Sequence, residues 1–96
     1  MKILKYIDWD TNKNQWLIKH RGVSFEEVLV LIQEKKVLAD LPHPNQKKYP
    51  NQKILVINLS DYIYIVPYVE DKEKIFLKTI YPSRKYTKKF LKENKL

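Results

Sequence analysis

Ninety-six residues are enough for one small domain with a single hydrophobic core, and we expect the whole chain, 1–96, to form it. The absence of cysteine excludes disulfides, cysteine-based zinc sites and a thiol nucleophile. Nineteen Lys and Arg against eleven Asp and Glu leave a net charge of +8, which attracts polyanions such as nucleic acid, an anionic membrane or an acidic protein.

The positive charge is concentrated at the C-terminal end of the chain. Residues 78–96 contain seven Lys and Arg and a single acid, Glu93. A general excess of lysine could raise the total, but it would not explain this distribution. No segment approaches the roughly 20 apolar residues that span a bilayer, and Lys2 and Lys5 interrupt the N-terminus too early for a signal peptide. We therefore expect a soluble, cytoplasmic protein without a membrane partner.

The N-terminal third predicts a strand and two helices. Residues 2–8 alternate in the manner of a strand, and Asp10 is a good N-cap for a helix over 11–20. Helical spacing predicts an inward face made of Lys13, Trp16, Leu17 and His20. Gly22 follows the helix at the place where a left-handed residue ends it most easily.

The second helix has the clearest local signature. Ser24 and Glu27 have the spacing of a capping box, and Val23 and Val28 have that of a hydrophobic staple. These signals predict a helix over 24–34.

The rest of the chain favours strands and a final basic helix. A short strand over 37–41 leads into a loop over 42–50 that contains three prolines. Three apolar runs separated by short polar turns then predict an antiparallel meander over 53–59, 62–69 and 74–81. Pro67 should mark a bulge or an outer position, because it lacks a backbone donor. Ser83 can cap a last helix over 84–93.

The resulting order, β-α-α-β-β-β-β-α, is that of an α+β domain, with helices on one face of a largely antiparallel sheet. Two segments of this chain also resemble a known family. Trp9-Asp10 with Lys13, Lys19-His20 and Gly22-Val23-Ser24-Phe25-Glu26-Glu27 resembles the N-terminal signature of BrnT-type toxins, and Ile80-Tyr81-Pro82-Ser83-Arg84-Lys85 resembles the strand-to-helix segment of that family. The likeness covers about residues 6–90, whereas the proline-rich loop is not part of the family pattern.

The resemblance implies the toxin of a type II toxin–antitoxin pair with a RelE-like fold. Such a toxin would cleave RNA without a metal and so stop translation. Its partner would be a small DNA-binding antitoxin that neutralises it, so operator DNA would be contacted only through the antitoxin. No cofactor is expected.

Metal-free RNA cleavage needs a base, an acid and cations around the developing phosphate charge. His20 is the first candidate for acid–base work, although it could equally be a helix-terminal residue packed against Trp16. His43, between two prolines, is read as a loop residue, and two histidines without nearby acids predict no metal site. Arg84 and Lys85 at the start of the last helix could hold a phosphate together with its backbone N–H groups.

Further contacts to RNA are predicted from lysines and tyrosines. Lys88 and Lys89 should contact phosphates, and Lys47 and Lys48 could close over RNA from the loop. Tyr62, Tyr64 and Tyr68 share one face of a strand. The tyrosines of that row could stack on unpaired bases, with Tyr64 as the predicted RNA contact, or they could belong to the core beneath a helix.

Three hypotheses remain open on the sequence: a ribonuclease toxin, a non-catalytic RNA- or protein-binding module that keeps the toxin fold, and a regulatory protein whose basic face binds an acidic partner.

Overall fold

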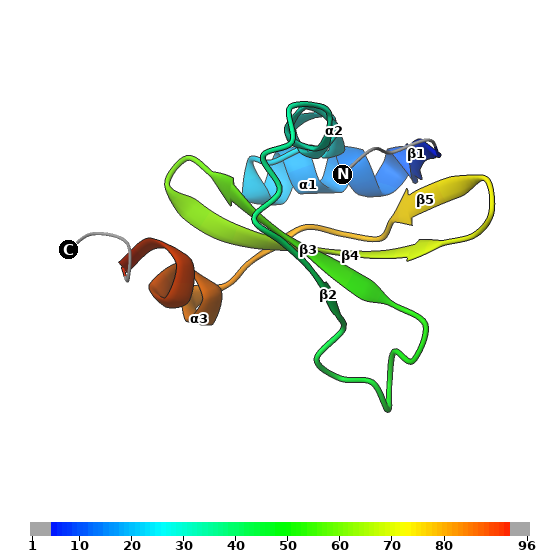
Figure 1. Ribbon diagram of the computed structural model, residues 1–96. Coiled ribbons are helices and arrows are strands. Elements are labelled where there is room, and N and C mark those ends of the chain that lie inside the picture. The colour runs from blue at the N-terminus through cyan, green and yellow to red at the C-terminus, as the bar shows by residue number, and fades with distance from the viewer. Residues whose placement is uncertain (1–4, 93–96) are drawn as a thin grey trace.

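A computed structural model describes residues 5–92 of the chain (Figure 1). The elements, in chain order, are β1 (Tyr6–Trp9), α1 (Thr11–Arg21), α2 (Phe25–Gln33), β2 (Ala39–Pro42), β3 (Lys53–Leu59), β4 (Tyr62–Glu70), β5 (Lys74–Leu77), β6 (Tyr81–Pro82), α3 (Arg84–Thr87) and the π-helical turn η1 (Lys88–Lys92). The start of the strand expected at 2–8 and the last residue of the helix expected at 84–93 lie outside the described residues. No helix within 5–92 is long and apolar enough to cross a membrane.

The strands form one mixed sheet in the order β1-β5-β4-β3-β2, and β6 pairs with β4 beyond the end of β5. The expected meander of β3, β4 and β5 is confirmed as antiparallel. β1 is the exception to the antiparallel pattern, since it pairs in parallel with β5, placing Tyr6 opposite Lys74. The α+β class is therefore confirmed, with one more strand than the sequence predicted.

Helices cover both faces of the sheet. The helices α1 and α2 pack on one face, which we call the helix face, whereas α3 and η1 pack on the other, which we call the C-terminal face (Figure 1). The two faces follow from strand alternation, because in β4 Val66 and Tyr68 join the first cluster and Ile63 and Ile65 join the second. The prediction that all helices pack on one face is wrong for this reason: β3 and β4 are apolar on both sides.

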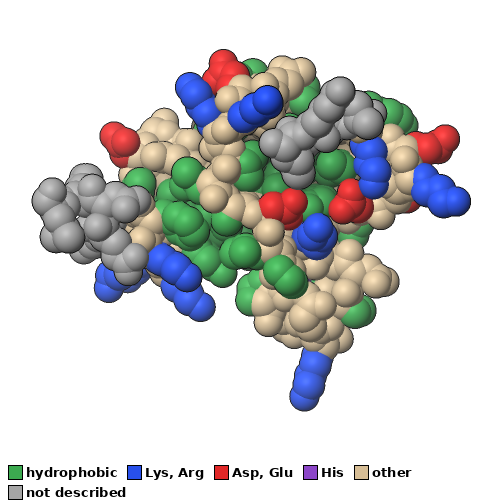
Figure 2. Space-filling view, in the orientation of Figure 1, with side chains coloured by type: hydrophobic (Ala, Val, Ile, Leu, Met, Phe, Trp, Pro, Cys, Tyr) green, Lys and Arg blue, Asp and Glu red, His purple; other side chains and the backbone are tan. Residues whose placement is uncertain are grey.

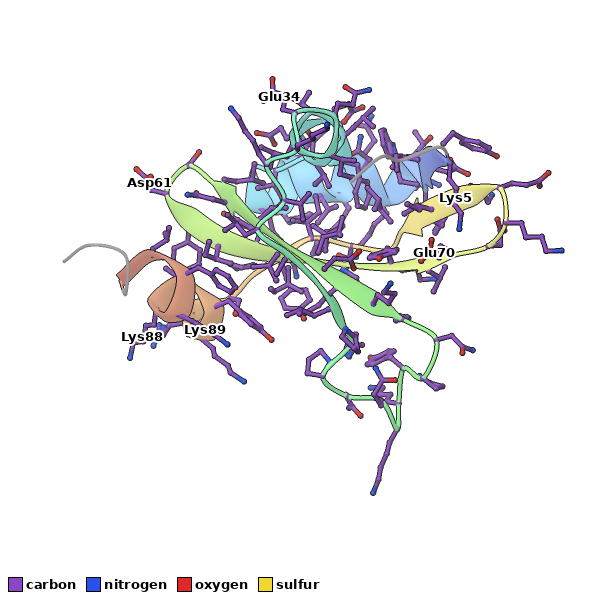
Figure 3. All side chains as sticks on the ribbon, viewed as in Figure 1. Lys5, Glu34, Asp61, Glu70, Lys88 and Lys89 are labelled. Atoms are coloured by element: carbon purple, nitrogen blue, oxygen red, sulfur yellow. The ribbon has the colours of Figure 1, made fainter. Side chains whose placement is uncertain are left out.

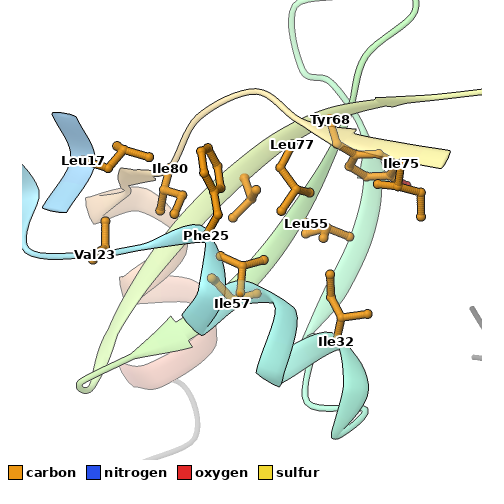
Figure 4. Close-up of a cluster of buried hydrophobic side chains, with 12 residues drawn as sticks. Leu17, Val23, Phe25, Ile32, Leu55, Ile57, Tyr68, Ile75, Leu77 and Ile80 are labelled. Carbon is orange, nitrogen blue, oxygen red and sulfur yellow. The ribbon is translucent and has the colours of Figure 1, made fainter. Parts of the chain in front are cut away.

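The main core lies on the helix face (Figure 4). Leu17 from α1 and Phe25 from α2 are fully buried there against Ile57 and Leu77 of the sheet. Phe25 also stacks on Trp9, with ring centroids 5.6 Å apart. Trp9 is thus a packing residue.

The start of α2 is capped as the sequence predicts. Ser24 accepts a hydrogen bond from the backbone N–H of Glu27, and the Glu27 carboxylate accepts one from the N–H of Ser24 at 2.8 Å. Val23 and Val28 are both buried, in keeping with a staple. Gly22 ends α1 with a φ of 66°, the left-handed conformation expected there.

The inward face predicted for α1 is confirmed for Leu17 but wrong for Trp16 and His20. The buried residues are Asn14 and Leu17, whereas Trp16 is 41% exposed and His20 is also exposed. At the surface the Trp16 ring contacts two charged groups, with Lys13 Nζ 4.5 Å and the Arg21 guanidinium 4.9 Å from its centroid.

Asn14 links α1 to the start of α2. Its side-chain oxygen accepts the backbone N–H of Phe25 at 2.8 Å, and its amide donates to the Glu26 carboxylate at 2.8 Å. That bond is the main reason why the pKa of Glu26 is lowered. Asn14 therefore satisfies one of the free N–H groups with which every helix begins.

Replacing Asn14 with alanine should destabilise the fold by about 1–3 kcal/mol, because the buried N–H of Phe25 would lose its partner. Urea denaturation followed by circular dichroism measures this loss. Gln15 is exposed on the same helix, and Gln15→Ala serves as the control. Equal stability of the two variants would contradict the role given to Asn14.

The strand predicted over 74–81 is divided in two. Residues 78–80 leave the sheet between β5 and β6, and Lys78 donates its backbone N–H to the carbonyl of Pro67 at 2.8 Å. In an antiparallel pair the N–H and C=O of one residue point to the same neighbouring strand. The nitrogen of Pro67, which has no hydrogen to donate, therefore faces residues 78–80, where the neighbouring strand is interrupted. The bulge expected at Pro67 is thus replaced by an interruption of the neighbouring strand, at residues 78–80.

Candidate nucleic-acid interface

Hydrogen bonds made by Ser83 and Thr87 join α3 to β4 and hold this helix on the C-terminal face. Ser83 caps α3 by accepting the N–H of Tyr86, and its own N–H donates to the Ile63 carbonyl at 2.9 Å. Thr87 accepts the N–H of Ile63 at 2.9 Å. Tyr86, Phe90 and Leu91 then pack on the apolar sheet beneath them. The basic residues of α3 and η1 are consequently left on the outside.

Seven exposed cations surround this face, and we call them the basic face: Lys47, Lys48, Lys78, Arg84, Lys85, Lys88 and Lys89. The ion pairs formed among residues 5–92 involve none of them. In Figure 2 Lys and Arg side chains gather beside the C-terminal end of the chain, and another projects from the tip of the loop between β2 and β3. Figure 3 shows Lys88 and Lys89 pointing away from the sheet, while the labelled acids Glu34, Asp61 and Glu70 lie elsewhere. The positive charge of this face is therefore uncompensated locally.

Within residues 5–92, four lysines outside the basic face have acidic partners: Lys5, Lys36, Lys53 and Lys74. Glu70 is 2.9 Å from Lys5 and 3.8 Å from Lys53, and the hydrogen bond from Lys5 is the main reason why its pKa is lowered. Lys74 lies 3.2 Å from Asp8 across the β1–β5 pair. Such pairs cancel positive charge near β1 and β5, whereas the cations of the basic face have no acidic partner among the described residues.

The proline-rich loop is ordered by its own hydrogen bonds. The His43 N–H donates to the Gln52 carbonyl at 3.1 Å, which closes the base of the loop. The N–H of Asn45 donates to Nδ1 of His43 at 3.0 Å, and the Tyr49 ring packs against the imidazole, tilted by 40° at a centroid distance of 4.5 Å. His43 is therefore fixed in orientation and not a free loop side chain.

A pocket of about 350 Å³ lies between this loop and the sheet. The loop contributes His43, Tyr49 and Gln52 to its lining, and the sheet contributes Pro67, Tyr81 and the segment 78–79. Burial raises the pKa of Tyr81, with smaller contributions from Tyr86 and Tyr49. Loop, β6 and α3 thus meet around Tyr81. The cations of the basic face lie on the loop, on the segment between β5 and β6, on α3 and on η1.

The structure brings together only some of the residues predicted from sequence. Arg84, Lys85, Lys88 and Lys89 share α3 and η1, and Lys47 and Lys48 lie on the loop on the same side of the sheet. Since α3 is only four residues long, its backbone dipole adds little to anion binding. The side chains of Arg84 and Lys85 are the remaining basis for a phosphate site there.

His20 lies apart from this group. It belongs to α1, which packs on the helix face, and its ring contacts Trp16 with centroids 4.8 Å apart. That contact corresponds to the alternative interpretation of His20 as a helix-terminal residue packed on Trp16.

In the row of tyrosines on β4, Tyr68 belongs to the hydrophobic core on the helix face. Tyr68 is 3% exposed and donates a hydrogen bond to Asp40 at 2.6 Å, and burial is the main reason why its pKa is raised. Tyr64 is partly buried and packs against the core on the helix face. Tyr64 therefore faces away from Arg84 and Lys85, because even-numbered residues of β4 point to the helix face.

Sequence reasoning missed the pocket residues Gln52 and Thr79, and it interpreted His43 only as a loop residue. The Thr79 hydroxyl is buried, and it is the one buried side-chain polar atom among the described residues without a hydrogen-bond partner. No local pattern distinguishes these residues; only the packing of the loop against segment 78–79 does. Within residues 5–92, no three His, Asp or Glu side chains converge as metal ligands would.

Comparisons with protein-family models, curated proteins and solved structures found no match to this chain.

Proposed function

We propose that this chain is the toxin of a type II toxin–antitoxin pair, with a BrnT-like sequence and a RelE-like fold, and that it acts in the cytoplasm as a metal-independent endoribonuclease that stops translation. A cognate DNA-binding antitoxin would neutralise it by covering the basic face. The observation that carries the proposal is this face itself: seven cations without acidic partners on one side of a small domain. Such a surface favours the phosphates of RNA.

The proposed chemistry is mainly electrostatic. Arg84 and Lys85 are adjacent, exposed and unpaired, so both can contact one phosphate or two neighbouring ones. When the 2′-hydroxyl attacks phosphorus, water would take its proton, the P–O5′ bond would break and water would protonate the leaving 5′-oxygen. The charges of Arg84 and Lys85 would stabilise the negative charge that develops on the phosphate oxygens. Lys88, Lys89 and the loop lysines would hold the flanking phosphates and fix the strand across the pocket.

The proposal is tested by inducible expression in a bacterium together with RNA cleavage by the purified chain in the presence of a chelator. The wild type should arrest growth and cleave RNA. The double variant Arg84→Ala/Lys85→Ala should lose cleavage by about 100-fold or more, as when charge-stabilising groups are removed from an active site. Coexpression of the product of the adjacent reading frame should restore growth.

A matched control removes two cations elsewhere. Lys19 and Lys72 are exposed on α1 and between β4 and β5, and Lys19→Gln/Lys72→Gln lowers the net charge equally. Harmless expression of the wild type with intact RNA would refute the toxin proposal. Salt-sensitive RNA binding without cleavage would instead favour a non-catalytic RNA-binding module. The separation of His20, the acid–base candidate, from the basic face favours this second candidate function. Negligible RNA affinity with tight binding to an acidic protein would favour a regulatory protein.

A further inference from the structure

We propose that the pocket between the proline-rich loop and segment 78–79 holds one unpaired nucleobase of the bound RNA, and that His43, Gln52 and Thr79 recognise its polar edge. This inference rests on the proposed function for its ligand class, RNA, but it concerns which base is selected and not how the strand is bound or cleaved. The basic face would bind any RNA strand, whereas the pocket would select which base enters.

The lining of the pocket suits a flat aromatic ligand. The rings of Tyr49, Tyr81 and Pro67 form its apolar walls, and its volume of about 350 Å³ is at the small end of the range for ligand sites. Proteins that recognise single-stranded RNA hold splayed bases against aromatic rings in this way. A free phosphate would leave these apolar walls uncovered.

Three polar groups in the pocket have unused hydrogen-bonding capacity. The Gln52 side-chain amide offers both donors and an acceptor, and no described residue bonds to it. The buried Thr79 hydroxyl has no partner, so it would gain one from a base that reaches it after a small shift of the segment. Lys78 lies at the same pocket and is available for the phosphate attached to the base.

The hydrogen bond from Asn45 decides which role His43 can have. Since a backbone N–H donates to Nδ1, that nitrogen is an acceptor, and the neutral imidazole must carry its proton on Nε2. A neutral ring of this tautomer has no free lone pair on Nε2 for removing a proton. His43 is therefore a hydrogen-bond donor that recognises an acceptor on the base, and not the general base of the reaction.

The phosphate-binding cations lie on both sides of the pocket. Lys47 and Lys48 are on the loop, while Arg84 and Lys85 follow β6, whose Tyr81 forms the opposite wall. We infer that a strand bound by both pairs would pass the pocket between them. This arrangement would present successive bases to it.

The experiment measures binding of hexaadenylate, hexacytidylate and hexauridylate to the wild type and to His43→Ala, Gln52→Ala and Thr79→Val at several salt concentrations. The wild type should prefer one homopolymer by about tenfold, the discrimination expected of one well-formed polar contact to a base. Each pocket variant should reduce that preference to about twofold or less while the salt dependence stays unchanged. Asn51→Ala, an exposed neighbour in the loop, should keep the preference.

Thr79→Val separates recognition from damage to the fold. Valine has nearly the same shape, and removing a buried hydroxyl without a partner should leave the midpoint of unfolding unchanged or higher. A Thr79→Val chain that is equally stable but less selective supports the pocket. Equal binding of all three hexamers by the wild type, or an unchanged preference in His43→Ala and Gln52→Ala, overturns it.

A second readout distinguishes failure of the pocket from failure of the toxin function. Nucleoside 3′-monophosphates should shift the NMR signals of the His43 ring, and these shifts should be lost in Gln52→Ala. If the chain neither arrests growth nor cleaves RNA but the shifts appear, the toxin proposal fails and the pocket stands. If RNA is bound and cleaved without any shift at His43, the pocket proposal fails alone.

Discussion

The quadruple variant Arg84→Gln/Lys85→Gln/Lys88→Gln/Lys89→Gln should bind single-stranded RNA roughly 600-fold more weakly than the wild type at about 0.1 M salt. Each phosphate contact to a single strand contributes about 0.7 to the slope of log affinity against log salt concentration. Four lost contacts therefore reduce the slope by about 2.8. Over the tenfold range of salt between about 1 M and about 0.1 M, this change in slope amounts to a roughly 600-fold loss of affinity. Fluorescence anisotropy with a labelled oligoribonucleotide over a series of salt concentrations measures both quantities.

The structure offers a control with the same net charge. Four exposed lysines lie away from the basic face, on α1, after α2 and between β4 and β5: Lys19, Lys35, Lys36 and Lys72. Their replacement with glutamine lowers the total charge equally but should leave most of the affinity and the slope. If both quadruple variants lose the same affinity, total charge and not the basic face governs binding, and our assignment of the surface is wrong.

Phe25→Ala should cost about 3–5 kcal/mol of folding stability, the usual result of truncating a fully buried aromatic residue. Phe25 is 0% exposed, stacks on Trp9 and lies where α1, α2 and the sheet meet. A domain of this size has a total stability of about 5–14 kcal/mol, so the variant would lose a large share of it. The urea midpoint measured by circular dichroism gives the loss.

Val30 provides the comparison for this prediction on the same helix. It is 47% exposed, and Val30→Ala should change stability by no more than about 0.5 kcal/mol. If Phe25→Ala unfolds at the same urea concentration as Val30→Ala, α2 does not dock on the sheet as described here.

Local signals made part of this fold predictable. The Ser24–Glu27 capping box and the left-handed Gly22 depend on residues within a few positions of each other, so the sequence was sufficient to place the ends of α1 and the start of α2. The antiparallel strands β3 and β4 were predicted for a similar reason, since a two-residue turn joins them.

Tertiary contacts decided what the sequence could not. Helical spacing favoured Trp16 as an inward residue of α1, but Asn14 takes an inward position because its partner, the N–H of Phe25, belongs to the next helix. Alternation placed Tyr64 and Tyr68 on one side of β4, yet only the position of α1 and α2 makes that side the covered one. The basic residues of α3 and η1 were found from composition, whereas His43, Gln52 and Thr79 became visible as a group only once the loop was seen against segment 78–79.

The parallel pairing of β1 with β5 has a consequence for how the chain folds. Tyr6 and Lys74 are neighbours in the sheet although 68 positions separate them in the sequence, and closing so long a segment costs much chain entropy. During synthesis the first strand must wait until β5 has been made. The hairpin of β3 and β4, by contrast, can form as soon as its own residues are available. The sheet therefore grows outward from its middle, and its N-terminal edge is the last part to close.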